Sequence, residues 1–219
     1  MKHLKLFESL NIERACRDLG LENFQIVDGL VNVDGLVNIP DKGLESFPVK
    51  FGRVSGYFYC YNNKLTSLEG APHSVGGCFS CFNNNLTSLE GAPRSVGEHF
   101  DCSNNDITSL EGAPDSVGSH FDCRNNKIMD FKVPEFSLDE DENFKCYNNP
   151  IYEIYSLFNT PKCIDLINEY SAVQGDKIIW NRLEEVFHGL NLEVPDPTSR
   201  SIWGRRVDNL KFKYFKVVF

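Results

Sequence analysis

Long apolar runs and an excess of basic residues are both missing from this chain. No stretch approaches the roughly 18 apolar residues that a membrane span needs, and the N-terminal segment MKHLKLFESLNIERACRDLG carries charges every few residues, unlike a secretory signal. The formal net charge is −9, whereas duplex nucleic acids select proteins with clustered Lys and Arg. The composition therefore argues against a membrane protein and against a duplex nucleic-acid binder.

Motifs of the common catalytic classes are absent as well. The sequence holds no P-loop, no H-E-x-x-H and no G-x-S-x-G, so we expect neither an enzyme nor a bound cofactor. Eight cysteines occur without a secretory signal, which predicts reduced thiols in a cytoplasm. Most are too widely spaced for a zinc site, and the one C-x-x-C, at Cys78 and Cys81, would place its thiols on opposite faces of a strand. The cysteines thus predict no metal or redox centre.

The chain is rich in one 21-residue repeat. Its core reads CYNNKLTSLEGAP at 60–72, CFNNNLTSLEGAP at 81–93 and CSNNDITSLEGAP at 102–114. A fixed period of this length is typical of a solenoid, in which each unit buries its apolar face against its neighbours. Two apolar residues recur at equivalent positions of the units. The first row is Phe58, Phe79, Phe100, Phe121 and Phe144, and the second row is Cys60, Cys81, Cys102, Cys123 and Cys146.

Within each unit, Phe and Cys alternate with polar residues, the pattern of a strand with one buried face. Strands of successive coils are expected to stack as a parallel sheet about 4.8 Å apart, with Phe and Cys inside. Of the two Asn residues, the second (Asn105) should point inward and bond backbone groups at the bend, while the first (Asn104) should face out. The Gly-Ala-Pro segment cannot continue a helix, so the outer side is predicted to be turn-like or 3₁₀.

The unit F-x-C-x-x-N-x-L resembles the leucine-rich repeat, whose core reads L-x-L-x-x-N-x-L. The opening MKHLKLFESLNIERACRDLG, the DGLVNVDG run, the NNKLTSLEGAP coils and the segment NPIYEIYSLFNTPKCIDLINEY also resemble leucine-rich repeat proteins of large tailed bacteriophages. The resemblance implies a solenoid with a parallel sheet on its concave face. It also implies a protein that acts in the cytoplasm of an infected bacterium, and it supplies no chemistry.

The predicted organisation has three parts. Residues 1–36 form an N-terminal cap, with a helix over 11–19 capped by Asn11 and a β-hairpin at the two Asp-Gly pairs. Residues 37–157 form about six coils, of which the first lacks the Asn. Residues 158–219 form a helical hairpin, with caps at Thr160 and Asp176, and then a terminal strand or packed tail. This tail is locally basic and is an alternative interaction segment, through Arg200, Arg205, Arg206, Lys211, Lys213 and Lys216.

The candidate site consists of the outward strand positions, which share the concave face. Exposed aromatic side chains are enriched at protein interfaces, so we expect a protein-binding module. The resemblance to bacteriophage proteins implies that its partner is a host or host-defence protein. One alternative is a small-ligand or metal site at His99, His120, Asp101 and Asp122. The other is that the outward side chains are simply exposed to solvent and have no binding role. The candidate binding residues are Tyr57, Tyr59, Tyr61, Ser80, Phe82, His99, Asp101, His120, Asp122, Arg124, Lys145 and Tyr147.

Overall fold

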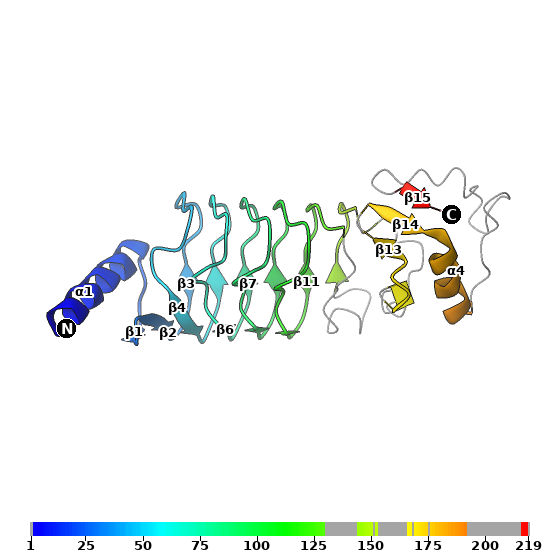
Figure 1. Cartoon of the computed structure of the whole chain (residues 1–219). Coiled ribbons are helices and arrows are strands. Elements are labelled where there is room, and N and C mark those ends of the chain that lie inside the picture. Colours follow the sequence, from blue (N-terminus) through cyan, green and yellow to red (C-terminus); the bar gives the residue numbers. More distant parts are fainter. Residues whose placement is uncertain are drawn as a thin grey trace.

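The computed structural model describes residues 2–129, 144–150, 152, 166–167, 169–174, 176–191 and 216–218, and all structural statements concern these residues. The chain is a β-solenoid whose coils lie side by side, with helix α1 (Lys2–Leu19) at one end and helix α4 (Trp180–Gly189) at the other (Figure 1). None of the helices described is long and apolar enough to cross a membrane.

Two sheets run along the solenoid. The first, here the parallel sheet, has the order β12-β11-β9-β7-β5-β3, and the second, here the mixed sheet, has the order β1-β2-β4-β6-β8-β10. The parallel sheet contains β3 (Val37–Asn38), β5 (Phe58–Tyr59), β7 (Phe79–Ser80), β9 (Phe100–Asp101), β11 (Phe121–Asp122) and β12 (Phe144–Lys145). The mixed sheet contains β1 (Phe24–Val27), β2 (Leu30–Val33), β4 (Phe51–Val54), β6 (Ser74–Val75), β8 (Ser95–Val96) and β10 (Ser116–Val117).

The mixed sheet corrects the prediction for the outer side of the coils. The Gly-Ala-Pro segments do form turns, and no 3₁₀ helix occurs in the described coils, but a Ser-Val strand follows each turn. In stacked identical coils, equivalent backbone groups lie about one strand spacing apart. Two extended residues can therefore pair with the equivalent residues of the next coil. Each Ser-Val strand carries a single apolar side chain, which is too few to leave an alternating pattern, so the sequence did not reveal these strands.

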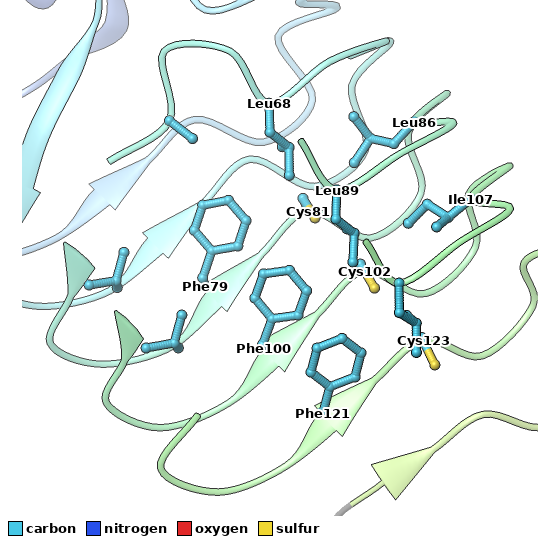
Figure 2. Packing of buried hydrophobic residues seen from close by; sticks show 14 of the residues in the cluster. Leu68, Phe79, Cys81, Leu86, Leu89, Phe100, Cys102, Ile107, Phe121 and Cys123 are labelled. Atoms are coloured by element: carbon cyan, nitrogen blue, oxygen red, sulfur yellow. The ribbon is translucent and has the colours of Figure 1, made fainter. Parts of the chain in front are cut away.

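The register of the parallel sheet confirms the repeat. Phe58 pairs with Phe79, Phe79 with Phe100 and Phe100 with Phe121. Their rings stack in a column with centroid distances of 5.3, 5.5 and 5.0 Å, and the cysteines form a second column beside them (Figure 2). All five cysteines of this column are buried, as predicted, and none of the described cysteines forms a disulfide.

The two asparagines of each unit occupy the predicted sides. Asn105 is buried, and its Nδ2 donates to the carbonyls of Cys81, Cys102 and Ser103 at 3.1, 3.1 and 3.2 Å. Its Oδ1 accepts from the backbone N–H of Leu86 at 3.0 Å. Asn104 is exposed and lies in the left-handed region, with φ of 55°. The first Asn therefore makes the turn, and the second bonds the coil to the one before it.

The N-terminal helix is longer than predicted. It begins at Lys2, so Asn11 lies inside it rather than at its cap. The preceding residues include Leu, Lys and Glu, which are good helix formers, and one interior Asn costs a helix only a fraction of a kcal/mol, about 0.7 at most. The expected apolar face is correct, since Cys16 and Leu19 are buried in the core and Ile12 and Ala15 pack against it. The β1–β2 pair forms the hairpin predicted at the first Asp-Gly.

The C-terminal part differs from the predicted helical hairpin. Residues 177–179 form strand β14 (Lys177–Ile179), which pairs with β13 (Val173–Gln174) and with β15 (Lys216–Val218). Helix α4 therefore starts at Trp180, and Asp176 lies in the turn before β14, where it pairs with Lys216 at 3.3 Å. β-Branched residues favour strands, and the partner strand β15 is too distant in sequence to detect locally. The predicted cap at Thr160 lies outside the described residues.

Candidate functional site

The outward side chains of the parallel sheet form one continuous surface, here called the strand face. They flank the inward Phe and Cys of each coil, so the alternation of the strand turns them outward. The predicted residues fall into three rows that follow the coils, and Asn143, which would extend the first row, lies outside the described residues. The rows are Tyr57, Cys78, His99 and His120; Tyr59, Ser80, Asp101, Asp122 and Lys145; and Tyr61, Phe82, Ser103, Arg124 and Tyr147.

Aromatic rings gather at one end of the strand face. Tyr57 stacks on Tyr59 with a centroid distance of 5.8 Å, and Tyr61 stacks on Phe82 at 4.6 Å with 10° between the planes. Tyr59 and Tyr61 are linked by a tilted contact at 6.1 Å. The structure thus brings together the four aromatic residues that the sequence singled out, here called the aromatic cluster (Tyr57, Tyr59, Tyr61 and Phe82).

Tyr57 reaches across the neighbouring coil. A Cβ on Gly77 would lie 2.8 Å from its ring, so the absence of a side chain there makes room for the tyrosine. Its hydroxyl donates to Oε1 of Glu98, two coils away, at 3.4 Å. The nearby Glu98 charge raises the pKa of Tyr57, and burial raises the pKa of Tyr59. Both phenols are therefore neutral donors near neutral pH.

The two histidines are neighbours, as predicted. The His99 and His120 rings stack with centroids 4.8 Å apart and 27° between their planes. The backbone N–H of His120 also donates to Nδ1 of His99 at 3.4 Å, which is long for a hydrogen bond.

The two aspartates are engaged within the sheet. Asp101 accepts from the backbone N–H of Ser103 at 2.9 Å, and burial raises the pKa of its carboxyl. Asp122 is buried and pairs with Arg124, whose Nη2 lies 2.6 Å from Oδ2. Arg124 in turn lies over the ring of Tyr147, 4.9 Å from its centroid, and donates to the tyrosine hydroxyl. This arrangement holds Asp122, Arg124 and Tyr147 as one closed polar cluster.

A further group of side chains, Cys78, Glu98 and His99, was not predicted to converge. The Cys78 thiol donates to Oε2 of Glu98 at 3.3 Å, and one ligand atom each of Cys78, Glu98 and His99 lies within 4.8 Å of the others. In the part of the chain that the structure describes, no other group of three such residues converges, and the His and Asp pairs do not form one. The sequence holds one indication of this group, because Glu98 occupies the position at which the two preceding coils have Gly56 and Gly77.

A second concavity lies away from the strand face. An open groove of about 710 Å³ follows the Gly-Ala-Pro turns and the start of the mixed sheet. His73, Arg94 and Asp115, one from each of three coils, line it. These three residues are an imidazole, a guanidinium and a carboxylate, so the groove has no uniform electrostatic character.

No family model, no curated protein and no solved structure matches this chain. The fold alone therefore defines its class, a β-solenoid with coils of about 21 residues and a helix at each end. The likeness to leucine-rich repeat and bacteriophage proteins rests on the sequence motifs.

Proposed function

We propose that this protein is a non-enzymatic binding module that holds a protein partner on its strand face. The observation that carries the proposal is the aromatic cluster, in which four rings from two adjacent coils contact one another at the surface. Tyr57 keeps 39% of its area exposed although it packs against a neighbouring ring. Large aromatic side chains in such positions dominate the affinity of many protein interfaces.

The rigidity of the sheet supports the same function. The backbone N–H of Cys60 donates to the carbonyl of Ser80 at 2.9 Å and that of Asn62 to the carbonyl of Phe82 at 3.1 Å, so the strands that carry the rings are fixed to each other. Rings that are already stacked lose little conformational entropy when a partner binds. Each anchor could then contribute about 2 kcal/mol or more to affinity.

The polar part of the strand face fits the rim of such an interface. The closed cluster of Asp122, Arg124 and Tyr147 lies on the same sheet beyond the rings, whereas Ser80, another predicted site residue, is buried beside Tyr59 and Phe82. Interfaces commonly combine an apolar centre with a polar rim. The sequence resemblance to bacteriophage leucine-rich repeat proteins extends the proposal to a partner from an infected bacterium, either a host protein or a host-defence protein, met in the host cytoplasm.

The experiment is an affinity capture from bacterial lysate, followed by direct titration of the captured protein. We expect Tyr59→Ala with Phe82→Ala to weaken binding by at least about a hundredfold, the loss of two ~2 kcal/mol anchors. The melting temperature should change little, because neither ring belongs to the buried core. A matched control is Leu10→Ala with Val27→Ala, which removes two exposed apolar side chains (52% each) outside the strand face.

The proposal fails if the double aromatic variant keeps its partner. Loss of the partner on substituting Arg205, Arg206, Lys211 and Lys213 instead would assign binding to the basic tail, which lies outside the described residues.

A second candidate function is the binding of a small ligand at the His and Asp pairs. The stacked imidazoles of His99 and His120 favour this function, since two adjacent rings could bind a planar group by stacking or an anionic group by hydrogen bonds. This candidate predicts that His99→Ala with His120→Ala abolishes binding while the aromatic double variant retains it.

A further inference from the structure

One group of side chains lies directly beside the aromatic cluster, at the point where Tyr57 reaches Glu98. Cys78 and His99 occupy equivalent positions in adjacent coils, and Glu98 precedes His99 directly. The backbone N–H of Phe79 donates to the carbonyl of His99 at 2.9 Å, so the parallel sheet fixes the two coils together at this point. We propose that Cys78, Glu98 and His99 form a three-ligand site for Zn²⁺.

The three side chains already converge. Their ligand atoms lie within 4.8 Å of one another, and Cys78 Sγ is 3.3 Å from Oε2 of Glu98. A tetrahedral zinc ion with Zn–S of about 2.3 Å and Zn–O of about 2.1 Å separates its sulfur and oxygen ligands by about 3.6 Å. The existing separation of sulfur and oxygen is therefore close to the required one, and the exposed His99 side chain supplies the third ligand.

The mixture of ligand types selects the metal. A thiolate and an imidazole suit a borderline-soft divalent ion such as Zn²⁺, whereas Mg²⁺ and Ca²⁺ prefer sites built from oxygen atoms. Three protein ligands leave the fourth tetrahedral position to water or to another molecule, as in zinc sites that stay accessible. The net charge of −9 adds a general attraction for cations.

A second contact lies on the other oxygen of the carboxylate. The Tyr57 hydroxyl approaches Oε1 of Glu98 at 3.4 Å, which is long for a hydrogen bond, whereas Oε2 faces Cys78 and is the oxygen available to the cation. Such outer contacts commonly fix the orientation of zinc ligands. At His99, the backbone N–H of His120 makes a long contact with Nδ1. A cation on Nδ1 would occupy the lone pair that accepts this contact, and a cation on Nε2 would leave the ring proton on Nδ1. The contact is lost in both cases, and because it is weak its loss costs little.

Binding requires that Cys78 release its thiol proton to solvent. Burial raises the pKa of this thiol, whereas the backbone N–H of His99 favours the thiolate; the Glu98 carboxylate raises the pKa further. Zn²⁺ opposes the effects of burial and of the carboxylate, because it replaces the proton between Sγ and Oε2 and neutralises both anionic groups.

The variation between coils agrees with this assignment. In the two preceding coils the residue before the strand entry is Gly56 or Gly77, and a Cβ at Gly77 would collide with Tyr57 at 2.8 Å. Glu98 breaks this pattern at the one coil where a carboxylate reaches both Tyr57 and Cys78.

The test is a titration of the full, reduced chain with Co²⁺, a spectroscopic substitute for Zn²⁺, followed by displacement with Zn²⁺. We expect one Co²⁺ per chain and a sulfur-to-cobalt charge-transfer band that Zn²⁺ abolishes. Cys78→Ser should remove the band, and Glu98→Gln and His99→Asn should each weaken Zn²⁺ binding by at least about tenfold. His99 is exposed, Cys78 is half-buried and Glu98 is not buried, and circular dichroism would verify that each variant keeps its fold.

Two variants serve as matched controls. Cys163→Ser removes a thiol outside the described residues, and His73→Asn removes an imidazole that lines the groove at the Gly-Ala-Pro turns. Both should bind Co²⁺ like the parent protein. The proposal is overturned if no stoichiometric uptake occurs, if the sulfur band persists in Cys78→Ser, or if His120→Asn weakens binding more than Glu98→Gln does.

Discussion

Each coil after the first holds two consecutive asparagines with different roles. The amide of Asn105 contacts three carbonyls and one N–H, so it satisfies backbone groups that the bend removes from water. Asn104 adopts a φ of 55°, which Asn tolerates better than most residues. The side chain of Asn104 also accepts from Nδ2 of Asn125 in the next coil at 2.9 Å, but this bond is exposed to solvent. The second Asn therefore supplies the buried hydrogen bonds, and the first supplies the left-handed backbone conformation.

Replacing these residues separates the two roles. We expect Asn105→Ala to lower the free energy of unfolding by about 1–3 kcal/mol more than Asn104→Gly, because it leaves buried backbone groups unpaired. Asn104→Gly is the matched control, since glycine accepts the left-handed conformation without a side chain. Urea denaturation measures both, and equal midpoints would contradict the inward assignment of Asn105.

At the scale of the element, the strands are short and their stability comes from the stacking of the coils. Most strands of the two large sheets contain two residues, too few for an isolated strand to persist. The stacking is tight where each Ser-Val strand ends in glycine: a Cβ on Gly97 would lie 2.0 Å from the carbonyl oxygen of Gly76. No side chain can be inserted there without separating two coils.

Gly97→Ala should therefore destabilise the protein by about 3 kcal/mol, at the upper end of the usual cost of overpacking. The contact is with backbone, which cannot rotate away as a side chain could. Ser95→Ala, an exposed change in the same strand, is the control and should alter the free energy of unfolding by less than about 0.5 kcal/mol. Thermal unfolding of the two variants compares them, and similar melting temperatures would refute the close approach.

At the scale of the whole molecule, columns of identical side chains fill the interior. The cysteine column has no access to solvent along most of its length, and burial raises the pKa of each thiol in it, for Cys146 to about 12. The folded chain keeps these thiols protonated at pH values where the unfolded chain releases their protons. Their contribution to stability is thus complete below about pH 8.5, the ordinary pKa of the thiol, and is lost as the pH rises toward the folded values.

The free energy of unfolding should fall steeply above that pH. Each buried thiol contributes a slope of about 1.4 kcal/mol per pH unit, and other titrating groups add their own. Cys102→Ala should therefore reduce the slope by one thiol's share, whatever its effect on stability at neutral pH. Urea denaturation at a series of pH values between 7 and about 11 would show it, and parallel curves for the variant and the parent would mean that Cys102 is not buried as a thiol.

The candidate site was partly predictable for the same reason as the coils. The rows of the strand face follow from the period of 21 and the alternation of each strand, so Tyr59 and Phe82 could be placed outward and on adjacent coils. The contacts between side chains of different rows could not be predicted, because they depend on side-chain rotamers and on the room that neighbouring residues leave. Tyr57 reaches Glu98 over 41 residues only because Gly77 between them has no side chain.

The sequence by itself determined the solenoid, its register and its interior columns, because an exact period repeats one local conformation and leaves the stacked copies a single way to bury Phe and Cys. Tertiary structure alone decided the second sheet, the strand at 177–179 and the meeting of Cys78, Glu98 and His99. In each of these, the partner groups lie in another coil or in a distant segment. Pairing of two-residue strands, of β14 with β15, and of ligands between coils is governed by distances through space, which no local pattern of residues records.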